Sequence, residues 1–413
     1  MNGLDDCYRA ALGTGTDPSG TPWNELDPAL LRTRRHSIKW TRYPADALPM
    51  FVAEMDFAVA PEIRRALVRA VEASDTGYLD GPGPLAAAFS GFARQRWGWE
   101  ILAPHVHLAT DVATGVVESI RAARPRGGRL ALPTPCYPGF FEMLEELPFE
   151  VVEIPLLDPG SAPAALDLAA IEREFAGERG IDAFILCNPH NPHGVPFSRD
   201  ELAALARLAA EHDVFVVSDE IHAPLTHEGI VFTPFAPLAA EAGALAVTTT
   251  SASKGFNLAG AKCSVIVAAD DRANHELEKL PPETVTRTSI LGLHANVAAF
   301  TESIDWLDRA VAQIEANQAL FARLVEDRLP GVGYRPGSAG YLAWLDLRGT
   351  GLGEHPAAAI LAEARVALND GRHFGTGGEG FARVNLACAP DTIVQGVDRI
   401  SALLAAIAEG TRA

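Results

Sequence analysis

Seven short apolar runs that alternate with helical stretches most constrain what this chain of 413 residues can fold into. Each run is short enough to be one buried strand, and segments rich in Ala, Leu and Glu lie between them. Such alternation favours a mainly parallel seven-stranded sheet covered by helices on both faces, an α/β architecture. The runs are residues 107–110, 129–132, 151–155, 183–187, 214–218, 244–249 and 263–268, and the helical stretches are 114–123, 140–146, 166–178, 199–212 and 237–241.

The remaining segments are expected to surround this α/β region. The first 48 residues are polar and interrupted by prolines, which predicts an arm that packs with a smaller domain. The strand pattern stops near Thr288, and a long stretch with apolar residues three and four apart follows, which predicts a connecting helix. The predicted parts are an N-terminal arm (1–48), a large domain (49–288), the connecting helix (289–324) and a small α+β C-terminal domain (325–413) with strands at 341–347 and 381–387.

Composition argues against several classes of function. With 53 acidic and 34 basic side chains the formal charge is -19, so we expect no binding to nucleic acid or to anionic membranes. The longest basic cluster, at residues 32–35, is interpreted as a solvated helix end. Five scattered cysteines without a C-x-x-C pair predict reduced thiols and no metal site. Residues 1–16 lack a leader pattern and no run is long enough to span a membrane, so the expected location is cytoplasmic.

Lys254 lies in an unusual setting for a lysine. It follows the apolar run that ends at residue 249 and lies in Ser251-Ala-Ser-Lys-Gly255, at the expected turn from a buried strand into a tight loop. Most lysines are solvated surface residues, and that reading stays open for Lys254 taken alone. The hydroxyl groups of Ser251 and Ser253 can donate to an anion, however, and a desolvated lysine has the lowered pKa that a Schiff-base nucleophile needs.

Polar groups also follow three other predicted strands, at the edge of a parallel sheet where ligands bind. Asp111-Val-Ala-Thr-Gly-Val116 opens a helix, whose first backbone N–H groups would suit a phosphate. Asn188-Pro-His-Asn-Pro-His-Gly194 contains two Asn-Pro turns, which also fit a merely rigid loop. In Asp219-Glu-Ile-His222 the aspartate also fits a helix N-cap, and the histidine a packing residue.

Taken together, these motifs resemble the pyridoxal-phosphate (PLP) enzymes of fold-type I, the aspartate aminotransferase superfamily. The pattern is Asn-Pro-x-Asn-Pro-x-Gly, then Asp-Glu, then Ser-x-Ser-Lys, and the likeness covers nearly the whole chain. Within that superfamily the chain resembles the cystathionine β-lyase-like C–S lyases of the MalY and PatB type. That resemblance rests on the segments 48–57 with Pro61, 218–222, 252–260, 341–346 and 378–387.

The resemblance implies a role for each matching position. Lys254 would bind PLP as a Schiff base and carry the substrate Cα proton, and Asp219 would pair with the ring nitrogen. Arg383 would bind the substrate α-carboxylate in a bidentate fork, with Asp56 and Asn191 on the substrate side. Asn191 would also bind the ring hydroxyl, Tyr137 would stack on the ring, and His222 would lie beside the cofactor. The phosphate would be surrounded by Thr114, Gly115, Val116, Ser251, Ser253, Lys262 and, from the partner subunit of a homodimer with shared active sites, Tyr78.

Several positions depart from the superfamily pattern. His222 stands where aminotransferases of this fold usually have tyrosine, and the lyase type has histidine there, which favours a lyase. Lys262 replaces a phosphate-binding arginine, Glu54 replaces an aspartate, and Gln313 stands in place of a tyrosine. These changes leave the substrate, and with it the reaction, open.

Three functions follow from the resemblance. The first is β-elimination from cystathionine or another S-substituted cysteine, which gives a thiol, pyruvate and ammonia. The second keeps PLP in an aminotransferase or an oxygen-dependent decarboxylating deaminase that acts on a related amino acid. The third is a PLP-binding regulatory protein. The residues do not identify the thiol or the pathway.

Overall fold

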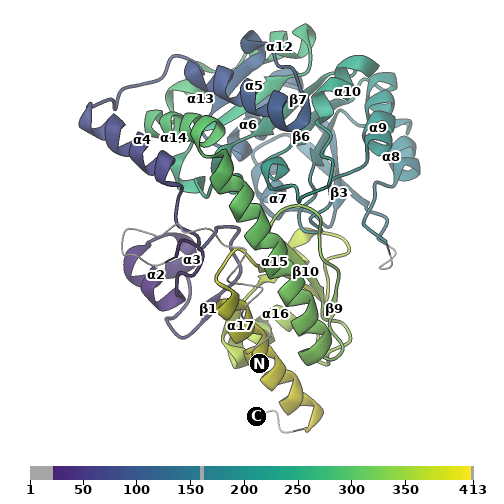
Figure 1. Cartoon of the computed structure of the whole chain (residues 1–413). Helices are drawn as coiled ribbons and strands as arrows, with labels where there is room; N and C mark the ends of the chain where they lie inside the picture. The colour runs from purple at the N-terminus through teal and green to yellow at the C-terminus, as the bar shows by residue number, and fades with distance from the viewer. Residues whose placement is uncertain (1–21, 159–161, 411–413) are drawn as a thin grey trace. The chain divides into compact units, whose positions relative to one another are not determined.

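A seven-stranded sheet forms the centre of the larger of two units (Figure 1). The order is β2-β8-β7-β6-β5-β3-β4, and β8 alone runs antiparallel to its two neighbours. The predicted mainly parallel α/β sheet is therefore confirmed. The strands are β2 (Val106–Ala109), β3 (Gly128–Thr134), β4 (Phe149–Pro155), β5 (Ala183–Cys187), β6 (Phe215–Asp219), β7 (Ala246–Thr250) and β8 (Ser264–Ala268).

The computed structural model describes residues 22–158 and 162–410. Unit 2 comprises Ala60–Asn191 and Val195–Leu307, and unit 1 comprises the described residues of Met1–Val59, Pro192–Gly194 and Asp308–Ala413. Cys7 and residues 1–16, where the sequence shows no leader pattern, lie outside the described residues. No helix in the described part of the chain is both long and apolar enough to cross a bilayer.

Two apolar layers explain why the large sheet is buried on both faces. Neighbouring residues of β5 alternate between them, since Ile185 packs into one cluster and Phe184 and Leu186 pack into the other. Helices α6 and α12 contribute to the first layer and α8, α9 and α10 to the second. Their bounds, with that of α7, are α6 (Val112–Ala123), α7 (Gly139–Leu144), α8 (Leu168–Phe175), α9 (Arg199–Glu211), α10 (Phe235–Ala242) and α12 (Asp271–Leu277).

Two helices, rather than the single connecting helix expected over 289–324, follow the α/β region. The helix α14 (Ile290–Glu302) packs on α4 (Pro61–Glu72) and α5 (Pro84–Trp97) in unit 2. The helix α15 (Ile304–Arg328) follows after Ser303, whose hydroxyl donates to the Ala298 carbonyl at 3.0 Å. A serine hydroxyl that bonds a carbonyl of the preceding turn competes with the helix ladder, which accounts for the break. The two units meet in sequence within α15.

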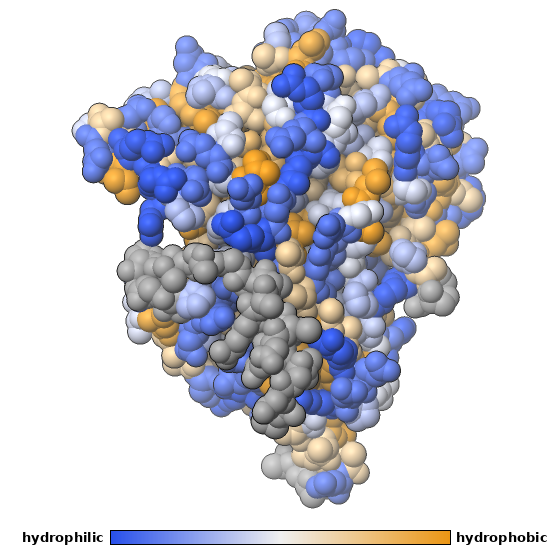
Figure 2. Space-filling view, in the orientation of Figure 1, coloured by the Kyte–Doolittle hydropathy of each residue, from blue (hydrophilic) through white to orange (hydrophobic). Residues whose placement is uncertain are grey.

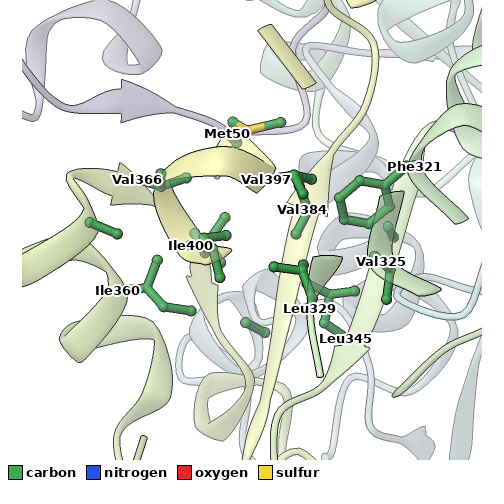
Figure 3. Close-up of a cluster of buried hydrophobic side chains, with 14 of the residues drawn as sticks. Met50, Phe321, Val325, Leu329, Leu345, Ile360, Val366, Val384, Val397 and Ile400 are labelled. Atoms are coloured by element: carbon green, nitrogen blue, oxygen red, sulfur yellow. The ribbon is translucent and has the colours of Figure 1, made fainter. Parts of the chain in front are cut away.

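Unit 1 is built on a four-stranded antiparallel sheet, in the order β12-β13-β10-β9. Figure 3 shows its core, where Met50 from the N-terminal segment lies with Val384, Val397 and Ile400. The N-terminal segment also adds β1, which pairs in parallel with β11. The elements are α2 (Pro28–Arg34), α3 (Ile38–Thr41), β1 (Leu48–Pro49), β9 (Gly333–Tyr334), β10 (Leu342–Asp346), α16 (Pro356–Ala359), β11 (Val366–Ala367), β12 (Asn369–Asp370), β13 (Phe381–Asn385) and α17 (Pro390–Ala408).

The basic cluster at residues 32–35 is not simply a solvated helix end, and that interpretation is wrong for two of its arginines. The Arg35 guanidinium donates to the carbonyl oxygens of Met55, Asp56 and Phe57 at 2.8 to 2.9 Å. Arg32 binds the carbonyls of Trp40, Pro44 and Ala47 in the same way. A planar guanidinium presents five donors, so each arginine satisfies several carbonyls of an irregular segment at once.

A buried ion pair ties the same N-terminal segment to residues 54–56. Lys39 Nζ lies 2.5 Å from the Asp56 carboxylate and 3.0 Å from the Glu54 carbonyl, and both charged side chains are at most 3% exposed. Burial raises the pKa of Asp56, although Lys39 and Arg35 act in the opposite direction. Removing one partner of such a pair leaves an uncompensated buried charge.

We therefore expect Lys39→Ala to lower the free energy of unfolding by about 3 to 5 kcal/mol, measured by denaturant unfolding. The control is Lys279→Ala, which removes a half-exposed lysine paired with Glu276 on the surface. That change should cost less than about 1 kcal/mol, because water screens an exposed pair. Equal losses in the two variants would contradict a structural role for the Lys39–Asp56 pair.

Candidate active site

The predicted site residues of unit 2 gather where three adjacent parallel strands end. Asp219 is the last residue of β6, Asn191 follows β5, and Lys254 follows β7. The register aligns Cys187 of β5 and Thr249 of β7 with Asp219. Because the carboxyl ends of parallel strands meet at one edge of a sheet, these segments share the edge where ligands bind in α/β folds.

Asp219 is a buried carboxyl group with few donors. Its side chain accepts one backbone hydrogen bond, from Ile221 N at 3.1 Å, and the residue is 7% exposed. Burial raises the pKa of Asp219 to about 7, and the Ile221 N–H and the charge of Lys254 act to lower it. A cationic N–H donor placed at this carboxylate would restore the charge balance that burial disturbs.

Lys254 lies on the short helix α11 (Ala252–Gly255), which is held by polar contacts on two sides. The Ser251 hydroxyl donates to the Cys263 carbonyl at 2.7 Å and accepts from Ser253 N at 3.1 Å. The amide N–H of Ala252 donates to the Asn296 side chain at 2.9 Å. Asn296 was not found in the sequence analysis, although a polar residue within the apolar helix α14 was a usable signal.

The start of α6 forms a second polar cluster. The Asp111 carboxylate accepts from Thr114 N and Oγ1, both at 2.9 Å, and from Lys262 Nζ at 2.7 Å. Burial raises the pKa of Asp111, but the Lys262 and Thr114 donors outweigh it and the pKa lies below its usual value. A side chain at Gly115 would place Cβ 3.3 Å from Thr249 and Ile266, so glycine allows α6 to pack directly on β7 and β8.

The other predicted residues of unit 2 differ in exposure. Asn191 and His222 are buried, Val116 is fully buried, and Tyr137 is 39% exposed. The Tyr137 ring lies over Gly139, where a Cβ would stand 2.4 Å from the ring, so a larger residue there would displace the ring. Tyr78 is 90% exposed, and the structure of one chain assigns it no role.

Arg383 and Asp56 belong to unit 1. Arg383 is 2% exposed, and its NH2 group lies 3.4 Å from the Phe51 carbonyl. The Asp56 carboxylate is engaged by Lys39, and Gln313 is buried in a chain of amide hydrogen bonds with Asn24 and Asn317. In this unit Asp56 and Gln313 therefore have structural partners of their own.

Glu220 is a further buried acid that the sequence analysis did not single out. Its Oε1 accepts from Ser218 Oγ and from Phe235 N, both at 2.9 Å. Burial raises the pKa of Glu220 to about 8, these two donors lower it, and the neighbouring Asp219 raises it further. Of the two adjacent acids, Glu220 therefore holds its proton more firmly than Asp219.

Across residues 22–158 and 162–410, no group of three or more His, Cys, Asp or Glu side chains is arranged to hold a metal ion. The groups at the strand ends are instead a lysine amine, a buried carboxyl, hydroxyls and amides. Such a set suits an organic ligand that carries an anionic group and a basic ring nitrogen.

Comparison with known proteins then decides the family. Residues 59–400 match the family described as aminotransferase class I and II. The chain belongs to this family. The predicted membership of the fold-type I superfamily is therefore confirmed.

The names of individual relatives and of one solved structure are more specific than the family description. The chain is 34% identical to cystathionine beta-lyase of Corynebacterium glutamicum, over 90% of this chain and 97% of that one. It is 33% identical to cystathionine beta-lyase PatB of Bacillus subtilis, over 90% and 98% of the two chains. The structure resembles the PLP-bound C-S lyase of Staphylococcus hominis, with a TM-score of 0.82, 26% identity and coverage of 90% and 96%.

The two buried acids predict an unusual pH dependence of stability for the cofactor-free protein. Between pH 4.5, the ordinary pKa of Glu, and about 8 the unfolded chain releases the Glu220 proton while the folded chain keeps it. Stability therefore falls as pH rises through this window. Glu220→Gln keeps a neutral acceptor for Ser218 and Phe235, so it should flatten the fall by up to about 1.4 kcal/mol per pH unit.

The measurement is denaturant unfolding of both proteins at intervals from pH 5 to 8. Asp219, whose pKa is raised to about 7, should leave part of the slope in Glu220→Gln. Parallel pH profiles for the wild type and the variant would show that Glu220 is ionised in the folded protein.

Proposed function

We propose that this chain is a PLP-dependent carbon–sulfur lyase, which cleaves cystathionine or another S-substituted cysteine to a thiol, pyruvate and ammonia. The observation that carries the proposal is the buried Asp219 at the end of β6. The positive charge of Lys254 lies close enough to lower the pKa of the Asp219 carboxyl group. The names of relatives at 33 to 34% identity support the lyase within the family. His222, which stands where aminotransferases of the fold usually have tyrosine, supports the same choice.

The donor set of unit 2 fits PLP. Asp219 is the acceptor for the ring nitrogen, and its raised pKa reflects a buried carboxylate for which a pyridinium N–H is a suitable partner. Lys254 is the amine for the aldehyde group, and Asn191 and Tyr137 serve the ring hydroxyl and the ring face. The hydroxyl groups and the cation of the phosphate site come from Thr114, Ser251, Ser253 and Lys262.

When bound, PLP supplies an electron sink for negative charge that develops at the substrate Cα. The chain supplies the proton transfer and the orientation. The Lys254 amine removes the Cα proton as a general base, and Asp219 stays ionised so that the ring nitrogen keeps its proton. Arg383 binds the α-carboxylate, and its planar guanidinium fixes the orientation of the substrate better than a lysine would.

The leaving group explains why elimination fits this set of residues. A thiolate departs from Cβ with the electron pair of the C–S bond and needs no strong acid, because thiols are far more acidic than alcohols. Hydrolysis of the remaining unsaturated amine then gives pyruvate and ammonia.

We expect purified holoenzyme to release thiol and pyruvate in equal amounts from cystathionine or from S-alkyl cysteines. Lys254→Ala should lower the rate by roughly a thousandfold or more, because both the Schiff-base amine and the proton carrier are lost. Borohydride should fix the cofactor to Lys254 in the wild type only. The assay follows thiol with a disulfide reagent and pyruvate with lactate dehydrogenase.

The same protein should be tested with amino acids and an oxo-acid acceptor, and for oxygen uptake. Oxo acid with stoichiometric pyridoxamine phosphate, without thiol release, would replace the lyase by an aminotransferase. Oxygen uptake with release of carbon dioxide would indicate the decarboxylating deaminase. Bound cofactor with no turnover in any assay would favour a regulatory protein.

The proposal includes a homodimer in which Tyr78 reaches the phosphate of the partner subunit. Tyr78 is 90% exposed, and the nearby helix α4 exposes Val68 and Val71 on one face. Hydrophobic residues interrupt the hydrophilic surface of α4 at the left of Figure 2. We take this exposed pair of valines as part of the proposed contact with the partner subunit.

Sedimentation of the wild type should show a dimer. We expect the dimer interface to bury more than roughly 2,000 Å² in total. Val68→Asp combined with Val71→Asp should shift it toward the monomer, because charges would be buried without partners. Arg69→Asp, on a different face of α4, is the control. A fully active wild-type monomer at assay concentration would refute the shared site.

The predicted cytoplasmic location is part of the proposal as well. Cys136, Cys187, Cys263 and Cys388 are buried free thiols, which supports a reducing compartment.

A further inference from the structure

The small sheet of unit 1 has two chemically different faces. Along β13 and β10, Val384 and Leu345 point into the apolar core, as Figure 3 shows, together with Ala382 and Ala343. The residues between them, among them Arg383 and Trp344, therefore lie on the opposite face. Asn369 of β12 and Trp344 of β10 are the direct cross-strand partners of Arg383.

Asn369 engages the Arg383 guanidinium in only one orientation of its amide. With the oxygen toward Arg383, the amide oxygen accepts from NH2 at 2.8 Å and the amide nitrogen donates to the Phe51 carbonyl at 3.2 Å. The reverse orientation would place donor against donor and acceptor against acceptor. Asn369 thus connects Arg383 to Phe51, whose carbonyl also faces the NH2 group.

The segment that carries Phe51 is itself fixed by the small sheet. The Asn385 amide donates to the carbonyls of Val52 and Glu54, both at 2.6 Å. The Tyr341 hydroxyl donates to the Ala53 carbonyl at 3.0 Å. The Phe51 carbonyl is therefore held in place as a hydrogen-bond acceptor for the guanidinium.

Phe374, the first ring of an aromatic column, lies against the same guanidinium. Arg383 Cζ lies 5.1 Å from the centroid of the Phe374 ring, and Phe374 is fully buried. Phe374 contacts Trp344 at 4.9 Å between centroids, and Trp344 stacks on Phe381 at 5.1 Å with an angle of 6° between the rings. Arg348 covers the far side of Phe381 at 4.7 Å.

We propose that Asn369 and Phe374 are positioning residues that set the plane and the rotation of the Arg383 guanidinium for binding the substrate α-carboxylate. Phe374 fixes the plane through a cation–π contact, and Asn369 fixes the rotation within that plane through the NH2 group. A bidentate fork binds a carboxylate only when both N–H vectors are aimed, so loss of either contact weakens recognition of the carboxylate. This inference rests on the role proposed for Arg383.

The test compares two ligands that differ only in the carboxylate. L-2-Aminobutyrate has no leaving group at Cβ, and propylamine is the same molecule without the carboxyl group. Binding of each to the holoenzyme is followed by titration calorimetry and by the absorption of the cofactor. Asn369→Ala and Phe374→Leu should each weaken binding of L-2-aminobutyrate by about tenfold and leave propylamine binding unchanged.

Phe381→Leu is the matched control, because Phe381 belongs to the aromatic column but the next ring, Trp344, separates it from Phe374. It should bind both ligands as the wild type does. Cofactor content and melting temperature are measured for each variant. Asn369 is only partly buried, so Asn369→Ala decides the question if Phe374→Leu fails to fold.

Arg383→Ala separates this inference from the proposed function. If Arg383→Ala abolishes the preference for the carboxylate ligand while Asn369→Ala and Phe374→Leu keep it, the positioning role is refuted and the role of Arg383 stands. If Arg383→Ala itself keeps the preference, the carboxylate site has been assigned to the wrong residue and both claims fail. Equal weakening of the two ligands in Asn369→Ala would also refute positioning.

Discussion

The carboxyl group of Asp219, buried at the end of a central strand, is the constraint on which the site in unit 2 depends. A carboxylate in this position is costly, and its pKa of about 7 expresses that cost. The neighbouring acid, Glu220, gives up its proton less readily than Asp219 does. Burial and the charge of the adjacent Asp219 raise the pKa of Glu220 to about 8, so Asp219 is the more readily ionised of the two acids. Lys254 is the nearby cation that already favours ionisation of Asp219.

Other polar contacts of unit 2 fix the backbone segments that carry the proposed site residues. Asn296 binds the first N–H of α11, Ser251 ties that helix to the strand that follows, and Asp111 gathers Thr114 and Lys262 at the start of α6. Each of these contacts fixes a short loop at the edge of the sheet. A site that must hold a cofactor in one orientation needs such supports, because loop residues left without them lose the required geometry.

Unit 1 uses the same principle on another segment. Residues 50–57 have few regular hydrogen bonds of their own, and side chains satisfy their carbonyls: Arg35 from one side, and Asn385 and Tyr341 from the other. Lys39 completes the set through Asp56. An irregular buried segment stays ordered only when its carbonyl groups find donors, and in this chain the donors come from positions that are distant in sequence.

From the sequence alone the strand runs, the helices between them and the residues at the strand ends were predictable, because burial periodicity and turn chemistry are local properties. That pattern placed Lys254, Asp219 and Asn191 near the ends of predicted strands, the family resemblance implied their roles, and the structure places them at or after the ends of three neighbouring strands. The break at Ser303, the carbonyl contacts of Arg32 and Arg35, the partner of Asp56, and the roles of Asn296, Glu220 and Asn369 were not predictable. Apart from the local contact of Ser303, each depends on groups that only the packed chain brings together, such as Ala252 with Asn296, or Phe51 with Asn369. The sequence therefore determined which chemical groups reach the edge of the sheet. Only the tertiary structure decided which of them are buried, which carry charge and which are held in place, because desolvation and hydrogen-bond partners exist only in the packed chain.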